Sequence, residues 1–248
     1  MFPIRDDNPT ELPPIVTVGI IVVTFAVWIL AQGAGLSLEA MEASVCNLGA
    51  IPAEMTGGDA SWGEGPCSPG GLTYGALFTS MFLHGGWGHI LGNMWFLWIF
   101  GNNIEDSMGH LRFLVFYILC GLAAAGAHVY ADPTSTLPMV GASGAISAIM
   151  GAYLLLYPRA KVRTVIFIII FFTVLEVPAF LYLGYWFLLQ LLGVVGPSVG
   201  GGVAFWAHIG GFVAGLVLIL FFRDPALVRA KRDKVVLPRD QLRFGGWV

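Results

Sequence analysis

Long apolar stretches alternate with short polar segments along most of this chain. Six stretches approach the roughly 20 residues that a helix needs to cross the hydrocarbon of a bilayer. They predict helices over 15–31, 88–102, 113–130, 143–157, 177–195 and 204–222. No polar module between them is large enough to fold alone. The pattern therefore predicts an all-α polytopic membrane protein, with one six-helix bundle over residues 15–222.

The stretch 162–195 is too long for one ordinary span. Glu176 and Pro178 interrupt it, and proline is tolerated in the first turn of a helix but breaks the interior. We therefore expect the fifth helix to start near Val177, with 164–173 lying at the inner interface or packed on the bundle. A single long kinked helix is the alternative.

Composition and the positions of the charged residues predict how the chain is oriented in the membrane. Only 11% of the residues are charged and 57% are hydrophobic, whereas about a quarter of a soluble domain is charged. Lys and Arg favour the cytoplasmic side of short loops. All twelve lie before the first predicted helix, after the second, after the fourth or beyond the sixth. We therefore expect both termini in the cytoplasm, with a segment 1–14 and a basic tail 223–248 that is an anchor or a partner- or lipid-binding segment.

The first loop, 33–80, is long and mixes Gly, Pro and acidic residues with Trp, Met and Leu. Such a loop is expected to rest on the outer membrane surface as short helices, with a merely solvated loop as the alternative. Cys46 and Cys67 lie in it, on a side that would be oxidising in a bacterial envelope. They form either one disulfide or two free thiols, while Cys120 lies alone in the third helix.

Polar side chains within the apolar stretches are the candidates for function, because polar groups in hydrocarbon are costly. His89 and Asn93 lie in the second helix, Ser143 in the fourth and His208 in the sixth. By the predicted topology these three helices all run from outside to inside. Each polar residue lies within about two turns of its helix's beginning, so we expect all four at similar depth near the outer face.

Small residues follow one face of the fourth and sixth predicted helices: Ser143, Ser147 and Gly151 in one, His208, Gly211 and Gly215 in the other. Small faces let membrane helices approach closely. If these faces meet, Ser143 and His208 come within hydrogen-bonding reach, as a nucleophile and its base require. No carboxylate lies at matching depth, so the sequence predicts a Ser-His dyad.

An oxyanion formed at such a dyad needs hydrogen-bond donors. His89 and Asn93 are four residues apart on one face of a helix, and the backbone N–H of Ser143 lies at a helix start, where amides lack intrahelical partners. Taken singly, each of these residues is better explained by packing or by bridging helices. Their joint occurrence at one depth favours an active site.

Three motifs in this order resemble those of the rhomboid family of intramembrane serine proteases. They are HGGWGHILGN over 84–93, GASGA over 141–145 and AHIGGFVAG over 207–215. The resemblance implies that Ser143 is the nucleophile, that His208 is the general base and later acid, and that His89 and Asn93 contribute to the oxyanion hole. It gives supporting roles to His84, Gly141, Gly144 and Gly211, and a structural role to Glu105 and Gly109.

The chain departs from the family pattern at three places. The family's Trp-Arg pair in the first loop would fall at Gly75 and Ala76, an aromatic residue that packs on the catalytic histidine would fall at Ser147, and an Arg is replaced by Ser107. None of these changes removes a reacting atom. They bear on how the first loop is anchored and how His208 is oriented.

The resemblance implies a serine endopeptidase that cleaves single-span membrane proteins near the outer face of the bilayer. We expect a small polar cavity lined by residues such as His84 and Ser147, and substrate entry between the second and fifth helices, with 196–202 as a lid. We expect no cofactor, no metal and no nucleic acid, and a location in a bacterial plasma membrane; the oligomeric state is left open.

Three rival interpretations remain. The first is a catalytically inactive relative that binds or escorts membrane proteins, which keeps the fold but needs no nucleophile. The second is a transporter or channel whose polar cluster binds a solute. The third is a metal site built from His84, His89 and His208, although the spacing of the first two directs them to different helix faces.

Overall fold

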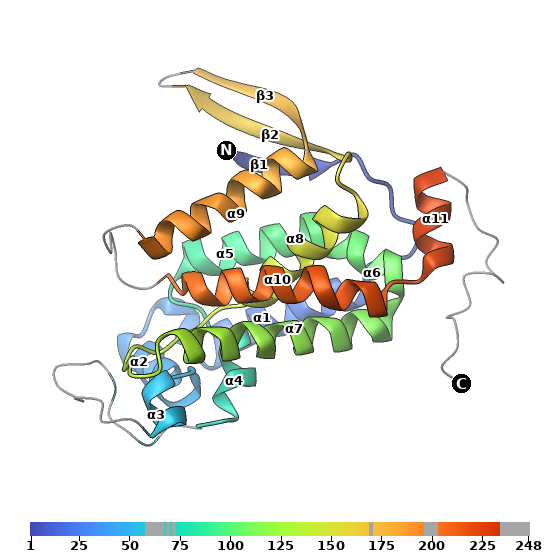
Figure 1. Cartoon of the computed structure of the whole chain (residues 1–248). Helices are drawn as coiled ribbons and strands as arrows, with labels where there is room; N and C mark the ends of the chain where they lie inside the picture. Colours follow the sequence, from blue (N-terminus) through green and yellow to red (C-terminus); the bar gives the residue numbers. More distant parts are fainter. Residues whose placement is uncertain (58–66, 68–69, 71–72, 169–170, 196–202, 234–248) are drawn as a thin grey trace.

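The computed structural model describes residues 1–57, 67, 70, 73–168, 171–195 and 203–233 (Figure 1). Long helices lie side by side in a bundle, and α9 crosses one side of it at an angle (Figure 1). The long helices are α1 (Ile15–Leu30), α5 (Trp87–Phe96), α6 (Asn102–Met108), α7 (His110–Ala131), α8 (Ser143–Leu156), α9 (Ala179–Val195) and α10 (Phe205–Phe222).

The six predicted helices are all present, and their bounds agree with the sequence pattern within a few residues except in the second. There, α5 continues through a π-helical segment (Leu97–Gly101) into α6, so the helical path runs from Trp87 to Met108. The predicted range 88–102 therefore covers most of α5 and the π-helical segment but only the first residue of α6.

Helix α8 is the centre of the bundle. Every residue from 144 to 153 is buried, because neighbouring helices surround it. The contact with α10 is close enough that a Cβ on Gly211 would collide with the carbonyl of Gly144, and one on Gly215 with the carbonyl of Ala148. The predicted small-residue faces therefore meet, and they bring α8 and α10 together at the end where Ser143 begins its helix.

The prediction of an all-α protein is wrong for residues 161–168 and 171–178. They form the antiparallel strands β2 (Lys161–Ile168) and β3 (Phe171–Pro178), and β1 (Phe2–Asp6) pairs with β2 to complete a sheet in the order β1-β2-β3. The run is rich in Val, Ile, Thr and Phe, which favour strands over helices. Pro178 ends β3 and α9 starts at Ala179, close to the predicted start of the fifth helix.

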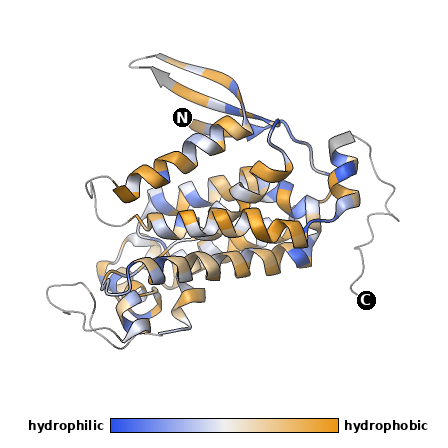
Figure 2. Ribbon diagram, in the orientation of Figure 1, coloured by the Kyte–Doolittle hydropathy of each residue, from blue (hydrophilic) through white to orange (hydrophobic). Residues whose placement is uncertain are grey.

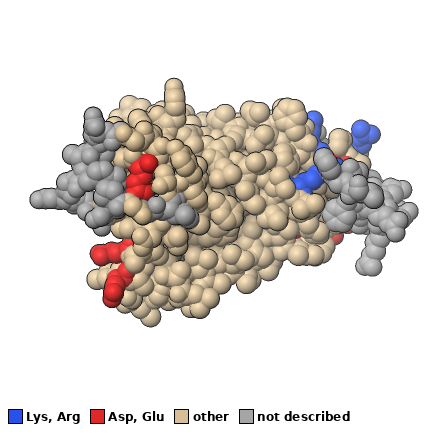
Figure 3. All heavy atoms as spheres, turned by 90° about the horizontal axis from the view of Figure 1, so that it is seen from below, with Lys and Arg blue, Asp and Glu red and all other residues tan. Residues whose placement is uncertain are grey.

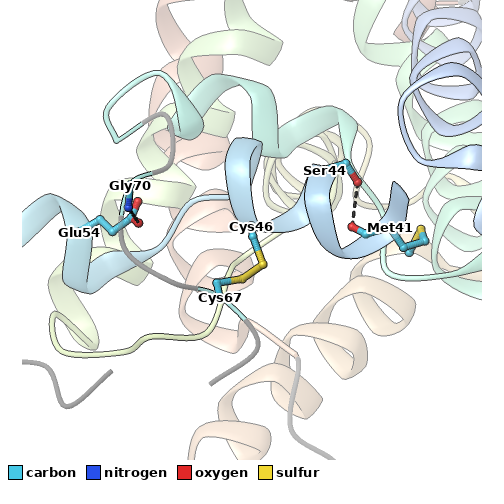
Figure 4. Close-up of a disulfide and its surroundings, with 6 residues drawn as sticks. All are labelled: Met41, Ser44, Cys46, Glu54, Cys67 and Gly70. Carbon is cyan, nitrogen blue, oxygen red and sulfur yellow. Dashed lines mark hydrogen bonds between the residues drawn. A yellow bond between two sulfur atoms is a disulfide. The ribbon is translucent and has the colours of Figure 1, made fainter. Parts of the chain in front are cut away.

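The first loop contains short helices, as predicted: η1 (Gly33–Gly35), α2 (Leu38–Leu48), α3 (Pro52–Thr56), α4 (Ala76–Thr79) and η2 (Ser80–Phe82). Cys46 and Cys67 form a disulfide with a Cα–Cα distance of 5.2 Å (Figure 4). Beside it, the backbone N–H of Gly70 donates to Glu54 Oε1 at 3.0 Å (Figure 4). The disulfide therefore ties residue 67 to α2, and Cys120 is a buried free thiol.

The opposite end of the bundle holds buried carboxylates with several partners each. Glu105 accepts hydrogen bonds from the backbone N–H groups of Val16 and Thr17, at 2.9 and 2.8 Å, and from the Thr17 hydroxyl at 2.7 Å. These amides belong to the first turn of α1, which has no side-chain cap of its own. Glu105 thus satisfies donors that a helix start leaves unpaired, consistent with its predicted structural role.

The chain after α10 is attached to this same end. Helix α11 (Pro225–Asp233) carries Lys231, whose Nζ donates to Asp106 Oδ2 at 2.9 Å in a pair that is almost fully buried. The N–H of Asp224 donates to the carbonyl of Ser107 at 2.8 Å. At least this part of the predicted basic tail therefore packs on the bundle. The domain boundaries 1–14, 15–222 and 223–248 stay predictions, and residues 234–248 lie outside the described part of the chain.

The surface is divided as expected for a membrane protein. The long helices are mostly apolar along their length (Figure 2). On the face in Figure 3, most Lys and Arg atoms gather at one end and most Asp and Glu atoms at the other, with a broad uncharged middle. Among the described residues, two helices, His110–Ala131 and Phe205–Phe222, are long and apolar enough to cross a membrane, and three more apolar helices are shorter. The count of six spans stays a prediction.

Candidate active site

Ser143 is the first residue of α8, and the backbone before it is built around a glycine. Gly141 has a φ of +124°, which residues with a Cβ rarely adopt. A Cβ at this position would also lie 2.8 Å from Nε2 of His89. Because the first amides of a helix have no intrahelical acceptor, the backbone N–H of Ser143 is available as a donor.

Ser143 and His208 contact each other directly. The Ser143 hydroxyl donates to Nε2 of His208 with an Oγ–Nε2 distance of 2.8 Å. His208 lies in the first turns of α10, and its place beside Ser143 follows from the close approach of Gly211 to Gly144 one turn further along. The geometry is that of a nucleophile and its general base. The pair was predicted from the depth and spacing of these residues.

His89 and Asn93 lie beside the start of α8 with N–H groups available. The backbone N–H of Gly85 donates to Nδ1 of His89 at 3.3 Å, so the ring proton of the neutral imidazole is on Nε2, the nitrogen next to Gly141. Nδ2 of Asn93 is buried and has no hydrogen-bond partner among the described residues. Buried amide groups almost always find a partner. An unused donor in this place is therefore well suited to an oxygen that arrives with a substrate.

A cavity of about 350 Å³ joins these four residues. Ser143, His208, His89 and Asn93 all line it, together with a mainly apolar wall drawn from α5, α7, α8, α9 and α10. The prediction that His84 and Ser147 line this cavity is wrong. Both are fully buried, and neither belongs to the described residues of the cavity wall.

Ser147 and His84 are used structurally instead. The Ser147 hydroxyl donates to the carbonyl of Ser143, one turn earlier in α8, at 2.6 Å. His84 holds the end of α1: its backbone N–H donates to Oε1 of Gln32 at 2.8 Å, and its carbonyl accepts from Nε2 of Gln32 at 2.9 Å. The His84 ring packs edge-to-face on the His89 ring, with centroids 5.0 Å apart. His84 is thus a support for His89, and Gln32 is an anchor that the sequence analysis missed.

Gln190 on α9 is the most important residue that the sequence analysis missed. Its side-chain carbonyl Oε1 lies 2.8 Å from Nδ1 of His208. Trp186, one turn earlier on the same helix, packs against the His208 ring at a centroid distance of 5.8 Å. The available signal was simple: Gln190 is a polar residue within a predicted span, which is costly unless it has a partner.

Comparison with known proteins agrees with this geometry. Residues 73–225, more than half of the chain, match the family model described as the Rhomboid domain. The chain belongs to the rhomboid family. It is similar to the RHOMBOID-like protein 5 of Arabidopsis thaliana, with 33% identity over 78 residues that cover 32% of this chain and 25% of the relative.

This rhomboid is also similar to a mitochondrial and a bacterial protein. The presenilin-associated rhomboid-like protein A, mitochondrial, of Danio rerio is 27% identical over 175 residues, which cover 67% of this chain and 42% of the relative. The rhomboid protease GluP of Bacillus subtilis is 37% identical over 78 residues, covering 32% and 15%. The matches thus span less than half the length of these relatives. Because they include a mitochondrial and a bacterial protein, the predicted bacterial plasma membrane is not supported.

Other local contacts lie near the positions that depart from the family motifs. The site of the missing aromatic residue is Ser147, and Trp186 supplies an aromatic ring to His208 from α9 instead. In the first loop, where Gly75 and Ala76 replace the Trp-Arg pair, the Thr79 hydroxyl donates to the carbonyl of Leu48 at 2.6 Å. At the end of the bundle where α11 packs, the carbonyl of Ser107 accepts from the backbone N–H of Asp224. The predicted lid, 196–202, lies outside the described residues.

Proposed function

We propose that this rhomboid is an intramembrane serine endopeptidase. It crosses the membrane six times with both termini in the cytoplasm, and it cleaves single-span membrane proteins near the outer face. The 2.8 Å contact between Ser143 Oγ and His208 Nε2 at the wall of a cavity carries this proposal. The name of the related GluP, which is called a protease, supports it.

The reaction follows from the positions of the groups. Ser143 Oγ attacks the scissile carbonyl while His208 Nε2 takes the hydroxyl proton, and the resulting oxyanion accepts hydrogen bonds from His89, Asn93 and the backbone N–H of Ser143. His208 then gives the proton to the leaving amine. Water hydrolyses the acyl-enzyme with His208 again acting as base, which regenerates Ser143.

The substrate must present an extended backbone in this cavity. A transmembrane helix shields its carbonyls by its own hydrogen bonds, so cleavage requires local unwinding. Segments with small, helix-destabilising residues near the outer face fit this requirement. We propose that they enter between α5 and α9, where the cavity wall includes Phe96 on one side and Trp186 on the other.

The test is cleavage of a model single-span protein by the purified chain in detergent and in proteoliposomes. Ser143→Ala and His208→Ala are expected to abolish cleavage, and Ser143→Ala also abolishes labelling by a fluorophosphonate probe. Ser147→Ala is the matched control, since it removes a hydroxyl one turn along α8 that only bonds the helix backbone; it is expected to retain activity. Equal cleavage by wild type and Ser143→Ala contradicts the proposal.

An inactive rhomboid that binds or escorts membrane proteins is the alternative. It predicts that folded wild-type protein captures single-span proteins but neither cleaves them nor reacts with the probe. The complete set of Ser143, His208, His89 and Asn93 at one cavity favours the enzyme, because binding alone needs neither a nucleophile nor a base.

A further inference from the structure

We propose that Gln190 is a positioning residue. Together with Trp186 it holds the His208 ring from α9, so the activity of the dyad depends on how α9 packs against α10. Both residues come from the same face of α9, one turn apart. Gln190 contacts Nδ1 of His208, the ring nitrogen that does not face Ser143, and Trp186 packs against the ring. The rate effects below rest on the proposed protease function, whereas the structural readout does not.

The hydrogen bonds define one tautomer of His208. Nε2 accepts from the Ser143 hydroxyl at 2.8 Å, so the proton of the neutral ring is on Nδ1 and donates to Oε1 of Gln190, also at 2.8 Å. The amide of Gln190 is itself oriented, because its Nε2 donates to the carbonyl of Trp186 at 3.1 Å. A base held by a third group is the arrangement that activates a serine. Here a neutral amide has the place that a carboxylate takes in a triad.

The distribution of buried residues in α9 indicates that this contact also holds the helix against the bundle. Three of its four buried residues lie near the start, at Ala179, Tyr182 and Leu183, and the fourth is Gln190. The rest of its outer half is largely exposed on the side away from the bundle, for example Leu192 at 56%. The one buried side chain of this half is therefore polar, and its amide carbonyl is hydrogen-bonded to the proposed catalytic base.

Aromatic side chains also pack α9 against α10. Phe187 stacks on Phe212 of α10 with centroids 4.5 Å apart, and Trp186 contacts both Phe212 and the His208 ring. Gly193 fits directly against the ring of Phe205, where a Cβ would collide. Since α9 forms one side of the proposed substrate entry, a displacement of α9 that admits substrate would also remove the acceptor from Nδ1. Chemistry would then require α9 to return to α10.

Three variants separate positioning from packing. Gln190→Leu keeps a similar volume but removes the acceptor, Gln190→Glu retains an acceptor oxygen, and Leu191→Ala changes a neighbouring exposed side chain as a control. We expect Gln190→Leu to lower kcat about 10- to 100-fold with KM within about twofold, since misplacing a catalytic group costs up to about 10²-fold. Gln190→Glu is expected to recover most of kcat, and Leu191→Ala to match wild type.

A small fluorophosphonate tests whether the loss lies in chemistry or in substrate entry. Gln190→Leu is expected to slow labelling of Ser143 by a factor similar to its loss of kcat, because the probe needs no opening for a transmembrane helix. Slow proteolysis with unchanged labelling would contradict the proposal, since it places the effect in substrate entry.

The tautomer is measured directly by ¹⁵N NMR of histidine-labelled protein without substrate. Wild type and Gln190→Glu are expected to show protonated Nδ1 and unprotonated Nε2 at His208, and Gln190→Leu a mixture of tautomers. An unchanged His208 pattern in folded Gln190→Leu overturns the inference. This measurement needs no cleavage, so it tests the role of Gln190 even if the wild type is inactive. An inactive wild type would contradict the proposed function but not this inference.

Discussion

The two ends of the bundle use buried polar side chains in opposite ways. At the end where α11 packs, which the predicted topology places inside, Asp106 accepts from the backbone N–H groups of Glu11 and Leu12, at 3.0 and 2.7 Å, and from Lys231. At the opposite end, which the same prediction places outside, Asn93 lines a cavity, and its buried Nδ2 has no partner among the described residues. Paired groups stabilise the folded state, and an unpaired donor is available to a ligand.

This contrast distinguishes buried polar side chains that stabilise the fold from those that are available for function. It predicts that substitutions at the inner end change the free energy of unfolding and leave the rate of an assembled site unchanged. Substitutions at the outer end should do the reverse.

Lys231→Met is the most direct way to break the inner end. Removing one partner of a buried ion pair leaves the other charge uncompensated and costs about 3–5 kcal/mol. Lys231 and Asp106 are both almost fully buried, so we expect a loss of this size in the free energy of unfolding, measured by denaturation in detergent. Cleavage by the folded fraction is expected to stay within about twofold of wild type.

The control is Lys231→Met combined with Asp106→Asn. The amide oxygen of Asn still accepts from the backbone of residues 11 and 12, but no buried charge remains. We expect the double variant to recover most of the lost stability. A double variant as unstable as Lys231→Met would show that the packing of the lysine, rather than the ion pair, stabilises the attachment of α11.

Asn93→Ala tests the outer end. Loss of one oxyanion donor costs about 3 kcal/mol in the barrier, or 10²–10³-fold in kcat. Among the described residues, no partner of Nδ2 loses a hydrogen bond, so the unfolding free energy is expected to stay within about 0.5 kcal/mol of wild type. Steady-state cleavage and thermal unfolding of the same preparation check both halves of this prediction.

Asn103→Ala is the matched control for Asn93→Ala. Nδ2 of Asn103 donates to Oδ2 of Asp6 at 2.8 Å, so its removal leaves a buried acceptor with one partner fewer. We expect a stability loss of about 1–2 kcal/mol and an unchanged kcat. If both asparagines lowered kcat alone, or stability alone, the contrast between the two ends would be wrong.

The contact between Ser143 and His208 could be predicted from the sequence for a physical reason. A span fixes depth, and a helix fixes which residues share a face, so Ser143 and His208 could be brought together from spacing and orientation. Gln190 could not be assigned in this way, because its partner depends on how α9 is rotated and tilted against α10. A tilt of this kind comes from packing and not from the length of the apolar run.

Strands β2 and β3 were missed for a different reason. An apolar run without clear periodicity fits a buried strand as well as a helix. The sequence analysis placed 164–173 at the inner interface or against the bundle, with one long kinked helix as the alternative, and did not consider strands. The decisive information is long-range, since β2 is paired not only with β3 but also with β1 at the other end of the sequence. Residue composition was the usable signal, because Val, Ile, Thr and Phe dominate the run.

Asp6, at the end of β1, makes the inner end sensitive to pH. Burial raises the pKa of its carboxyl to about 6 from a usual 3.8, although the hydrogen bond from Tyr153 and the charge of Lys231 act in the opposite direction. The folded state therefore holds a proton between about pH 4 and 6 that the unfolded chain releases. Raising the pH through this window disfavours the folded state, and the contribution is lost above about pH 6.

Asp6→Asn isolates this contribution, because an amide oxygen still accepts from Tyr153 and Asn103 but carries no titrating proton. From pH 4.5 to 7.5 we expect wild type to lose about 1–3 kcal/mol of unfolding free energy relative to Asp6→Asn. Comparing the two proteins cancels the titrating groups that do not interact with Asp6. Parallel pH profiles of denaturation in detergent would show that Asp6 is ionised throughout, with Lys231 compensating its charge. Asp6 would then be a paired carboxylate like Asp106, which sharpens the difference between this end and the cavity around Asn93.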